Sequence, residues 1–193
     1  MMYVKFFKRL VDILISLLLL IITIPFLLVA AIGIKLSSPG PILFLQKRIG
    51  QNGNGFQIYK LRTMELDPGR GIGQTYTSDP AVFRFGKILR RLKIDELPQI
   101  FNVLRGDMSI VGPRPCLRET YVDMPKWARA RFLVRPGITG FAQISGNVAL
   151  TWEERWIHDV HYVEKISLML DFKIIIKTIA VVVAGEESFK VRL

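Results

Sequence analysis

Hydrophobic positions form one long block near the start of the chain. Residues 13–34 are apolar apart from Ser16, Thr23 and Gly33. A straight helix over this run would be roughly 33 Å long, enough to cross the hydrocarbon core of a bilayer. The pattern therefore predicts a helix that enters a membrane.

Three interpretations of this run stay open. The first is a cleaved signal peptide, because Lys5, Lys8 and Arg9 precede the run and residues 29–31 (Val-Ala-Ala) resemble a cleavage site. The apolar stretch is long for a signal peptide. The second is an ordinary membrane-spanning helix. The third is a re-entrant helix, which enters and leaves the membrane on the same face.

A proline near the middle of the run favours the re-entrant helix. Pro25 removes a helix hydrogen bond and kinks the axis, and Thr23 is placed to cap the freed backbone groups. Basic residues flank both ends of the run, so the positive-inside rule slightly favours a cytosolic location for both. We predict a helix–break–helix membrane anchor over residues 1–36 and a second domain over residues 37–193, packed on the membrane interface.

Alternating apolar and polar positions follow the anchor. They predict two strands over residues 42–49 and 56–64. Between the strands, residues 50–55 contain two Asn-Gly pairs, which are a strong hairpin signal. Residues 65–80 hold several glycines and prolines without an apolar period, and we predict a mobile loop there.

Amphipathic patterns predict four helices, over residues 81–92, 95–104, 118–132 and 152–165. Pro98 is tolerated only in the first turn of a helix, which places Asp95 and Glu96 at the N-terminus of the second one. Gly106 then follows as its C-cap. The apolar run 166–184 is interrupted by charges, which favours an interfacial or core helix over a second span. The predicted fold class is α+β, mainly helical, with a small β-hairpin and interfacial amphipathic helices.

The charge of the chain narrows the choice of partner. The 193 residues carry a formal net charge of +11, which favours an anionic partner: nucleic acid, anionic lipid or a phosphorylated small molecule. The single cysteine, Cys116, excludes an intrachain disulfide and a zinc site built from cysteines.

Two adjacent carboxylates stand out within this basic background. Asp95 and Glu96 follow a window with five cations in residues 84–93. One interpretation is helix capping, since acidic residues are favoured in a first turn. The other is chemistry on a phosphate, in which an ionised Asp95 attacks phosphorus or binds Mg²⁺ together with phosphate oxygens.

Several cations are placed to serve that chemistry. Lys60 and Arg62 alternate on the second predicted strand and so share one face. Arg90 precedes Asp95 by five residues, and Arg114 lies in a rigid Pro-Arg-Pro turn. A fixed arginine suits bidentate phosphate binding. For each cation the alternative is a solvated basic face or a lipid-headgroup contact.

A second candidate site is the pair His158 and His161, which could bind a metal ion. The two histidines share a helix face, but no third ligand is evident. Surface or interface roles are favoured for both over a metal site.

The order of motifs along the chain resembles the bacterial sugar transferase family, the monotopic phosphoglycosyl transferases that act on polyprenol phosphate. The likeness covers nearly the whole chain. Its motifs are Ser38-Pro39-Gly40-Pro41, Gln46-Lys47-Arg48-Ile49-Gly50, Lys60-Leu61-Arg62-Thr63-Met64, Ile94-Asp95-Glu96-Leu97-Pro98-Gln99, Asn102-Val103-Leu104-Arg105-Gly106-Asp107-Met108-Ser109, Val111-Gly112-Pro113-Arg114-Pro115, Arg135-Pro136-Gly137-Ile138-Thr139-Gly140 and Ala142-Gln143.

The resemblance implies an activity. A UDP-sugar would give its phosphosugar to undecaprenyl phosphate and release UMP, as the first membrane step of glycoconjugate assembly. In the family Asp95 would attack the β-phosphate to form a covalent phosphosugar-enzyme, and the lipid phosphate would then attack that intermediate. Mg²⁺ is implied as cofactor with Asp95 as its protein ligand. Glu96 would position groups or handle a proton.

The resemblance also implies a setting. Lys60, Arg90 and Arg114 would hold phosphate or the carboxylates, and the first helix would be re-entrant in the bacterial inner membrane, with the catalytic domain on the cytosolic face and anionic membrane lipid beside it. The family often has a Ser-Pro pair at the break, where this chain has Ile24 before Pro25. The sugar and the downstream pathway are not revealed, and a homodimer stays open.

Two rival functions explain less of the sequence. A non-catalytic, membrane-anchored basic module would account for the charge and the anchor but not for two carboxylates within the cations. Nucleic acid is not an expected partner, because no surface pattern interleaves aromatic and basic residues. A one-step transferase of the polytopic type would need more than one hydrophobic segment.

Overall fold

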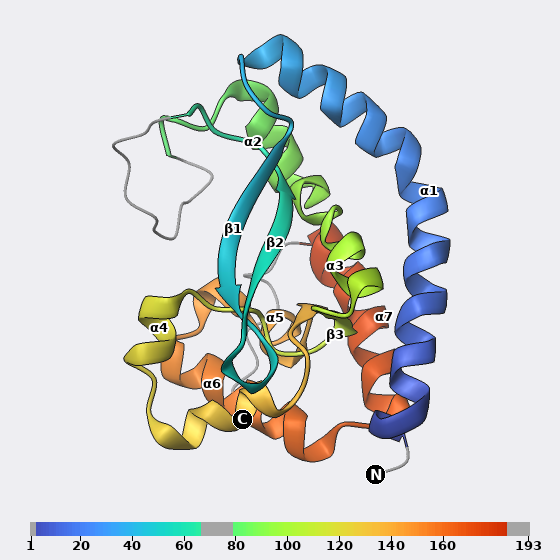
Figure 1. Cartoon of the computed structure of the whole chain (residues 1–193), viewed down its shortest axis with the longest axis vertical. Coiled ribbons are helices and arrows are strands. Elements are labelled where there is room, and N and C mark those ends of the chain that lie inside the picture. Colours follow the sequence, from blue (N-terminus) through green and yellow to red (C-terminus); the bar gives the residue numbers. More distant parts are fainter. Residues whose placement is uncertain (1–2, 67–78, 185–193) are drawn as a thin grey trace.

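A long N-terminal helix lines one side of the molecule (Figure 1). The computed structural model describes residues 3–66 and 79–184. Within them a π-helical turn, η1 (Tyr3–Phe7), leads into α1 (Lys8–Ser37). By length and composition, α1 is the only helix in the described residues that could cross a membrane.

In α1 the pattern of burial is the opposite of that in a helix of a water-soluble protein: polar residues are buried and apolar residues are exposed. Its buried residues include Lys8, Asp12 and Ser16, whereas large apolar side chains such as Phe26 and Leu28 are exposed. Only 17% of its most apolar 18-residue window is buried. A soluble protein would leave this apolar surface in water at a high free-energy cost. The pattern therefore fits a helix surrounded by lipid.

The predicted break in this helix takes the form of a bend. The structure has a single helix, α1, with Pro25 inside it, but Figure 1 shows that the helix changes direction along its length. The Thr23 hydroxyl donates to the Leu20 carbonyl at 3.4 Å, which is a weak contact. Re-entry into the membrane and the division at residue 36 stay predictions.

Buried polar contacts attach α1 to the rest of the chain. Lys8 forms an ion pair of 2.7 Å with Asp171, which lies on the last helix, α7 (Leu168–Ala184). Asp12 accepts hydrogen bonds of 2.9 Å from the Ser109 hydroxyl and 3.0 Å from the Ile110 amide. These polar residues therefore face the protein, while most of the large apolar side chains of α1 face outward.

The predicted hairpin is confirmed. β1 (Leu43–Ile49) and β2 (Gly55–Leu61) pair antiparallel with Arg48 opposite Phe56. The connection is a short 3₁₀ turn in which Asn52 has φ 57° and Gly53 φ 77°; asparagine and glycine tolerate this left-handed backbone best.

The segment that carries the two carboxylates differs from its prediction. The helix predicted from residue 95 begins later: α3 (Gln99–Arg105) has Pro98 as its N-cap and Gly106, at φ 95°, as its C-cap. Asp95 and Glu96 lie before α3, in a 3₁₀ turn, η3 (Ile94–Glu96). A preceding helix, α2 (Arg84–Arg91), is shorter than predicted.

A second, parallel strand pair was not predicted. β3 (Ser109–Val111) pairs with β4 (Gly137–Thr139), and three-residue strands leave too short a pattern to recognise. A Cβ on Gly137 would collide with the backbone of Gly112, and glycine is therefore required where the two segments cross. This close approach fixes the turn that follows β3.

The remaining helices lie around the end of the hairpin at which β1 and β2 are joined (Figure 1). The helix predicted over residues 118–132 is wrong, because Pro125 divides it into two pieces. The elements are α4 (Arg118–Val122), η4 (Lys126–Leu133), α5 (Phe141–Ile144), η5 (Asn147–Ala149) and α6 (Trp152–Lys165). The prediction for α6 is confirmed, with a capping box between Thr151 and Glu154. The glycine-rich part of the predicted loop, residues 67–78, lies outside the described residues.

One main core joins these elements. Side chains of β2, α3 and β3 pack there with those of α6 and α7; examples are Ile58, Val103, Met108, Tyr162 and Ile174. Figure 1 shows α3 between the hairpin and α1. The core thereby places the end of β2, η3 and the turn after β3 next to one another.

Candidate active site

Three separate segments meet at Glu96. Lys60, near the end of β2, donates to Glu96 Oε1 at 2.8 Å. Arg114, in the turn after β3, donates to Oε2 at 3.1 Å and also to Oε1. The flat guanidinium therefore binds both carboxylate oxygens, and Lys60 adds a second cation.

These cations decide the charge of Glu96. Burial by itself disfavours the charged form, but Arg114 and then Lys60 overcome it and hold the pKa of Glu96 well below its ordinary range. Glu96 is thus a carboxylate at neutral pH and serves to fix the two cations in place.

The environment of Asp95 differs from that of Glu96 and shifts its pKa in the opposite direction. Its side chain is buried, and its Oδ1 has no hydrogen-bond partner among the described residues. Burial raises the pKa of Asp95, the neighbouring Glu96 adds to the rise, and Lys60 and Arg90 oppose it only in part. The predicted helix N-terminus is not where Asp95 lies, since η3 precedes α3; that Asp95 is ionised stays a prediction.

Two adjacent carboxyl groups therefore have pKa values shifted in opposite directions. Glu96 is satisfied by cations, whereas Asp95 presents an oxygen without a hydrogen donor. An oxygen in that state is more basic and more nucleophilic than a solvated carboxylate. The pair thus combines a reactive group with a fixed support.

Replacement of Arg114 by Gln tests this account. We expect the pKa of Glu96 to rise, because Arg114 is the largest lowering influence on it. Carbon-13 NMR titration of labelled glutamate carboxyls, with Glu96→Gln to assign the signal, measures the shift. An unchanged titration in a folded Arg114→Gln protein would contradict the assignment of Arg114 as the main partner.

The other predicted cations divide into two groups. Arg90 donates to the Thr63 hydroxyl at 2.9 Å and is close enough to Asp95 to lower its pKa. Arg62 is fully buried and donates to Ser38 and to the Pro41 carbonyl. Its contacts thus anchor the loop after α1, and its predicted role in substrate binding gains no support from them.

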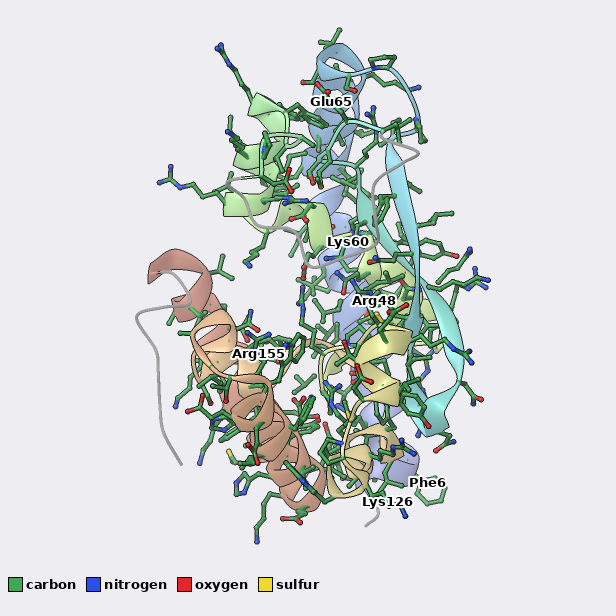
Figure 2. The ribbon with its side chains drawn as sticks, turned by 90° about the vertical axis from the view of Figure 1, so that its left-hand side faces the viewer. Phe6, Arg48, Lys60, Glu65, Lys126 and Arg155 are labelled. Atoms are coloured by element: carbon green, nitrogen blue, oxygen red, sulfur yellow. The ribbon has the colours of Figure 1, made fainter. Side chains whose placement is uncertain are left out.

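Arg48 is a cation at the site that sequence reasoning missed. It shares a hairpin face with Lys60, because Phe44, the partner of Lys60, lies four residues before Arg48 on β1. Figure 2 shows both side chains on the same side of the hairpin. Burial and then Arg114 lower the pKa of Arg48 to about 10. The sequence predicted the hairpin but not the strand register on which this shared face depends.

A cavity of about 550 Å³ lies along the hairpin. Lys47, Gln57 and Tyr59, from the hairpin face opposite Lys60, line it together with Arg48 from the site face. Asp95, Glu96 and the side chains bound to Glu96 do not line the cavity, and Arg48 is the point at which the cavity meets the candidate site.

A metal site made of protein ligands alone is absent from residues 3–66 and 79–184, where no three acidic, histidine or cysteine side chains converge. His158 and His161 instead both contact the ring of Phe141, each at 5.4 Å between centroids. Asp95 is the better Mg²⁺ candidate, because Mg²⁺ is commonly held by one or two carboxylates and completed by substrate phosphates.

Comparison with known sequences identifies the family. The family profile described as "Bacterial sugar transferase" matches residues 3–185. The chain belongs to the bacterial sugar transferase family. The resemblance stated from its motifs is thereby confirmed.

Named relatives within the bacterial sugar transferase family include two nucleotide-sugar enzymes. One, from Aeromonas hydrophila, is named UDP-N-acetylgalactosamine-undecaprenyl-phosphate N-acetylgalactosaminephosphotransferase; it is 43% identical over 93% of this chain and 44% of its own length. A UDP-glucose:undecaprenyl-phosphate glucose-1-phosphate transferase from Caulobacter vibrioides is 42% identical over 94% and 72%.

A third relative is closer in length. The exopolysaccharide production protein PSS of Rhizobium leguminosarum is 42% identical over 89% of this chain and 92% of its own length. By contrast, the chain spans less than half of the Aeromonas protein. The family match over residues 3–185 contains both carboxylates and all the cations described above.

Proposed function

We propose that this protein transfers a phosphosugar from a UDP-sugar to undecaprenyl phosphate and releases UMP. The single observation that carries the proposal is the buried Asp95 oxygen without a partner among the described residues, next to Glu96 and close to Lys60, which Glu96 binds. Relatives named for this reaction support the choice of substrates.

The reaction proceeds in two displacements at one carboxylate. An Asp95 oxygen attacks the β-phosphorus of the UDP-sugar, the bond from that phosphorus to the bridging oxygen breaks, and UMP leaves with the electron pair. A phosphate oxygen of the lipid then attacks the same phosphorus and the bond to Asp95 breaks. The products are polyprenyl-diphosphate-sugar and the original carboxylate, so atoms and charge balance.

The cations have separate tasks in this scheme. Arg114 and Lys60 are held by Glu96, and their positive charges stabilise charge that develops on the phosphate oxygens. Arg90 stands beside Asp95 and favours its ionised form. Asp95 would hold Mg²⁺ together with the diphosphate, and the ion when bound would neutralise phosphate charge.

The membrane setting follows from the acceptor. A polyprenyl chain stays in lipid, so the carboxylate has to lie near headgroup depth, and the outward apolar surface of α1 provides the anchor. We propose a re-entrant α1 in the bacterial inner membrane, with the catalytic part on the cytosolic face and basic surfaces against anionic lipid.

The test of the reaction is UMP release by the purified protein in nanodiscs with Mg²⁺, undecaprenyl phosphate and a panel of UDP-sugars. We expect release with at least one donor, and only when the lipid phosphate is present for multiple turnovers. A single burst of UMP without lipid would mark the covalent step. Ternary-complex kinetics would contradict the two-displacement route, and silence with all donors would contradict the proposed reaction.

The topology has its own prediction. Single cysteines introduced as Phe6→Cys and Ser37→Cys, in a Cys116→Ser background, mark the two ends of α1. We expect a membrane-impermeant maleimide to label both only from the cytosolic side, because a re-entrant α1 would leave the membrane on the face from which it enters. Pro25→Ala is expected to expose part of the Phe6→Cys population on the other side. Labelling of the two cysteines from opposite sides in the parent would establish a spanning helix.

A further inference from the structure

The backbone of the turn that carries Arg114 is held on both sides by strands. Before it, the Gly137 amide donates to the Pro113 carbonyl at 3.0 Å; after it, the Ile49 amide donates to the Cys116 carbonyl at 2.9 Å. The carbonyl of Arg114 itself lies between these two points and accepts a hydrogen bond of 2.6 Å from Nη2 of Arg131.

Arg131 is in turn fixed from a third element. Its Nε and Nη2 both bind Oδ2 of Asp159, at 3.0 and 2.7 Å. Arg131 lies in η4 and Asp159 in α6, and both side chains are at least 95% buried. A continuous set of contacts therefore runs from α6 through Arg131 and the Arg114 backbone to the Arg114 side chain and Glu96.

The buried pair is a poor source of stability. Removal of two charges from water costs several kcal/mol for each ion, and apolar replacements of similar volume are often neutral or stabilising. Here Oδ1 of Asp159 has no partner among the described residues. Burial raises the pKa of Asp159 even beside Arg131. The pair instead fixes the orientation of the Arg131 side chain, because a planar guanidinium places its N–H groups at fixed angles.

We propose that Arg131 and Asp159 are positioning residues of the active site, which fix the Arg114 backbone and thereby hold the Arg114 guanidinium on Glu96. Neither residue has a role in the motif-based predictions. For its effect on turnover the proposal rests on the proposed function; for its effect on Glu96 it does not.

The state of Glu96 reports this position directly. The charged groups that face Glu96 are Lys60 from β2, Arg114 from the turn, Arg48 from β1 and the adjacent Asp95. If Arg114 moves away, its lowering influence weakens and the pKa of Glu96 rises. A residue that only supports the fold would leave this titration unchanged in a folded protein.

The test compares three variants in the full-length protein. The double variant Arg131→Met/Asp159→Leu removes both buried charges and keeps the volume. Arg131→Lys keeps the charge pair but loses the fork. Arg129→Met is the control, because Arg129 is an exposed arginine two residues away in η4. Each protein is measured by carbon-13 titration of Glu96 and by kcat and KM for UMP release.

We expect the double variant to raise the pKa of Glu96 in the direction expected for Arg114→Gln. Its kcat should fall by about 10- to 100-fold, the usual effect of a small misplacement, with KM changed less than about twofold because neither side chain touches substrate. Arg131→Lys should also raise the pKa of Glu96 and lower kcat, as the double variant does. Arg129→Met should change neither quantity.

A parental Glu96 titration in the folded double variant would overturn the proposal. If the double variant does not fold, the titration of Arg131→Lys decides in its place, since that protein keeps the buried charge pair; a parental titration there overturns the proposal too. If the parent releases no UMP, the proposed function fails, while the Glu96 titrations still decide whether Arg131 and Asp159 position Arg114.

Discussion

Replacement of Asp95 by Asn is expected to lower UMP release by at least about 10³-fold, the scale seen when a covalent nucleophile is removed from an enzyme. The amide has nearly the same shape, but it has no electron pair basic enough to attack phosphorus. With a donor labelled at the β-phosphate, we also expect the labelled protein band to disappear. The measurements are UMP release and the yield of labelled protein after rapid denaturation.

The same variant should not lose stability. Burial raises the folded-state pKa of Asp95 above its unfolded value, so the folded state holds the proton more tightly. Ionisation of Asp95 therefore costs stability, and that cost is fully present above the folded pKa and absent below the unfolded one. The amide in Asp95→Asn cannot ionise, and the melting temperature of this variant at neutral pH should equal or exceed that of the parent.

Controls separate this result from a general effect of charge. Asp123→Asn changes an exposed carboxylate in the segment between α4 and η4, and it should retain parental UMP release. In the parent, UMP release should decline as pH falls through the raised pKa of Asp95, at a higher pH than a solvated aspartate would give. Parental activity or an undiminished labelled band in Asp95→Asn would exclude Asp95 as the nucleophile.

Local patterns predicted the parts of the fold that are themselves local. The hairpin followed from alternation and Asn-Gly pairs, and α6 followed from its period and its Thr151–Glu154 capping box. The β3–β4 pair joins segments about 28 residues apart through three-residue strands. Such a pairing has no periodic signal, and it is the element that sets the position of Arg114.

In the candidate site, too, local features were predicted from the sequence and long-range features were not. Motifs identified Asp95, Glu96, Lys60 and Arg114, because each lies in a distinctive local sequence. Their pKa values depended on burial and on which cation each carboxylate meets, and a chain pattern contains neither. The predicted face shared by Lys60 and Arg62 fails for a related reason: β2 ends at Leu61, and Arg62 turns toward Ser38.

The buried polar residues of α1 were also missed, since a lysine or aspartate at the start of an apolar run looks like a flank. Lys8, Asp12 and Ser16 acquire meaning only when α7 and β3 are placed beside them. The sequence indicated the apolar residues that place the helix in lipid. The structure shows the buried polar residues that attach the helix to the rest of the chain.

That attachment gives the second large expected effect. Asp171 accepts hydrogen bonds from Lys8 at 2.7 Å, from Tyr3 at 2.6 Å and from Tyr162 at 2.7 Å. Asp171→Leu leaves the Lys8 ammonium buried without this counter-charge. Loss of one partner of a buried pair costs about 3–5 kcal/mol, a large part of the stability of a domain this size.

Unfolding by sodium dodecyl sulfate from mild-detergent micelles, followed by tryptophan fluorescence, measures this cost. The double variant Lys8→Met/Asp171→Leu should recover much of the loss, because it removes both charges and keeps the volume. Asp123→Leu, at an exposed position, should cost under about 0.5 kcal/mol. If Asp171→Leu unfolds like the parent, or if the double variant is no more stable than the single one, the ion pair is not what attaches α1 to α7. If the double variant recovers, the pair serves chiefly to neutralise charges that α1 brings into the protein.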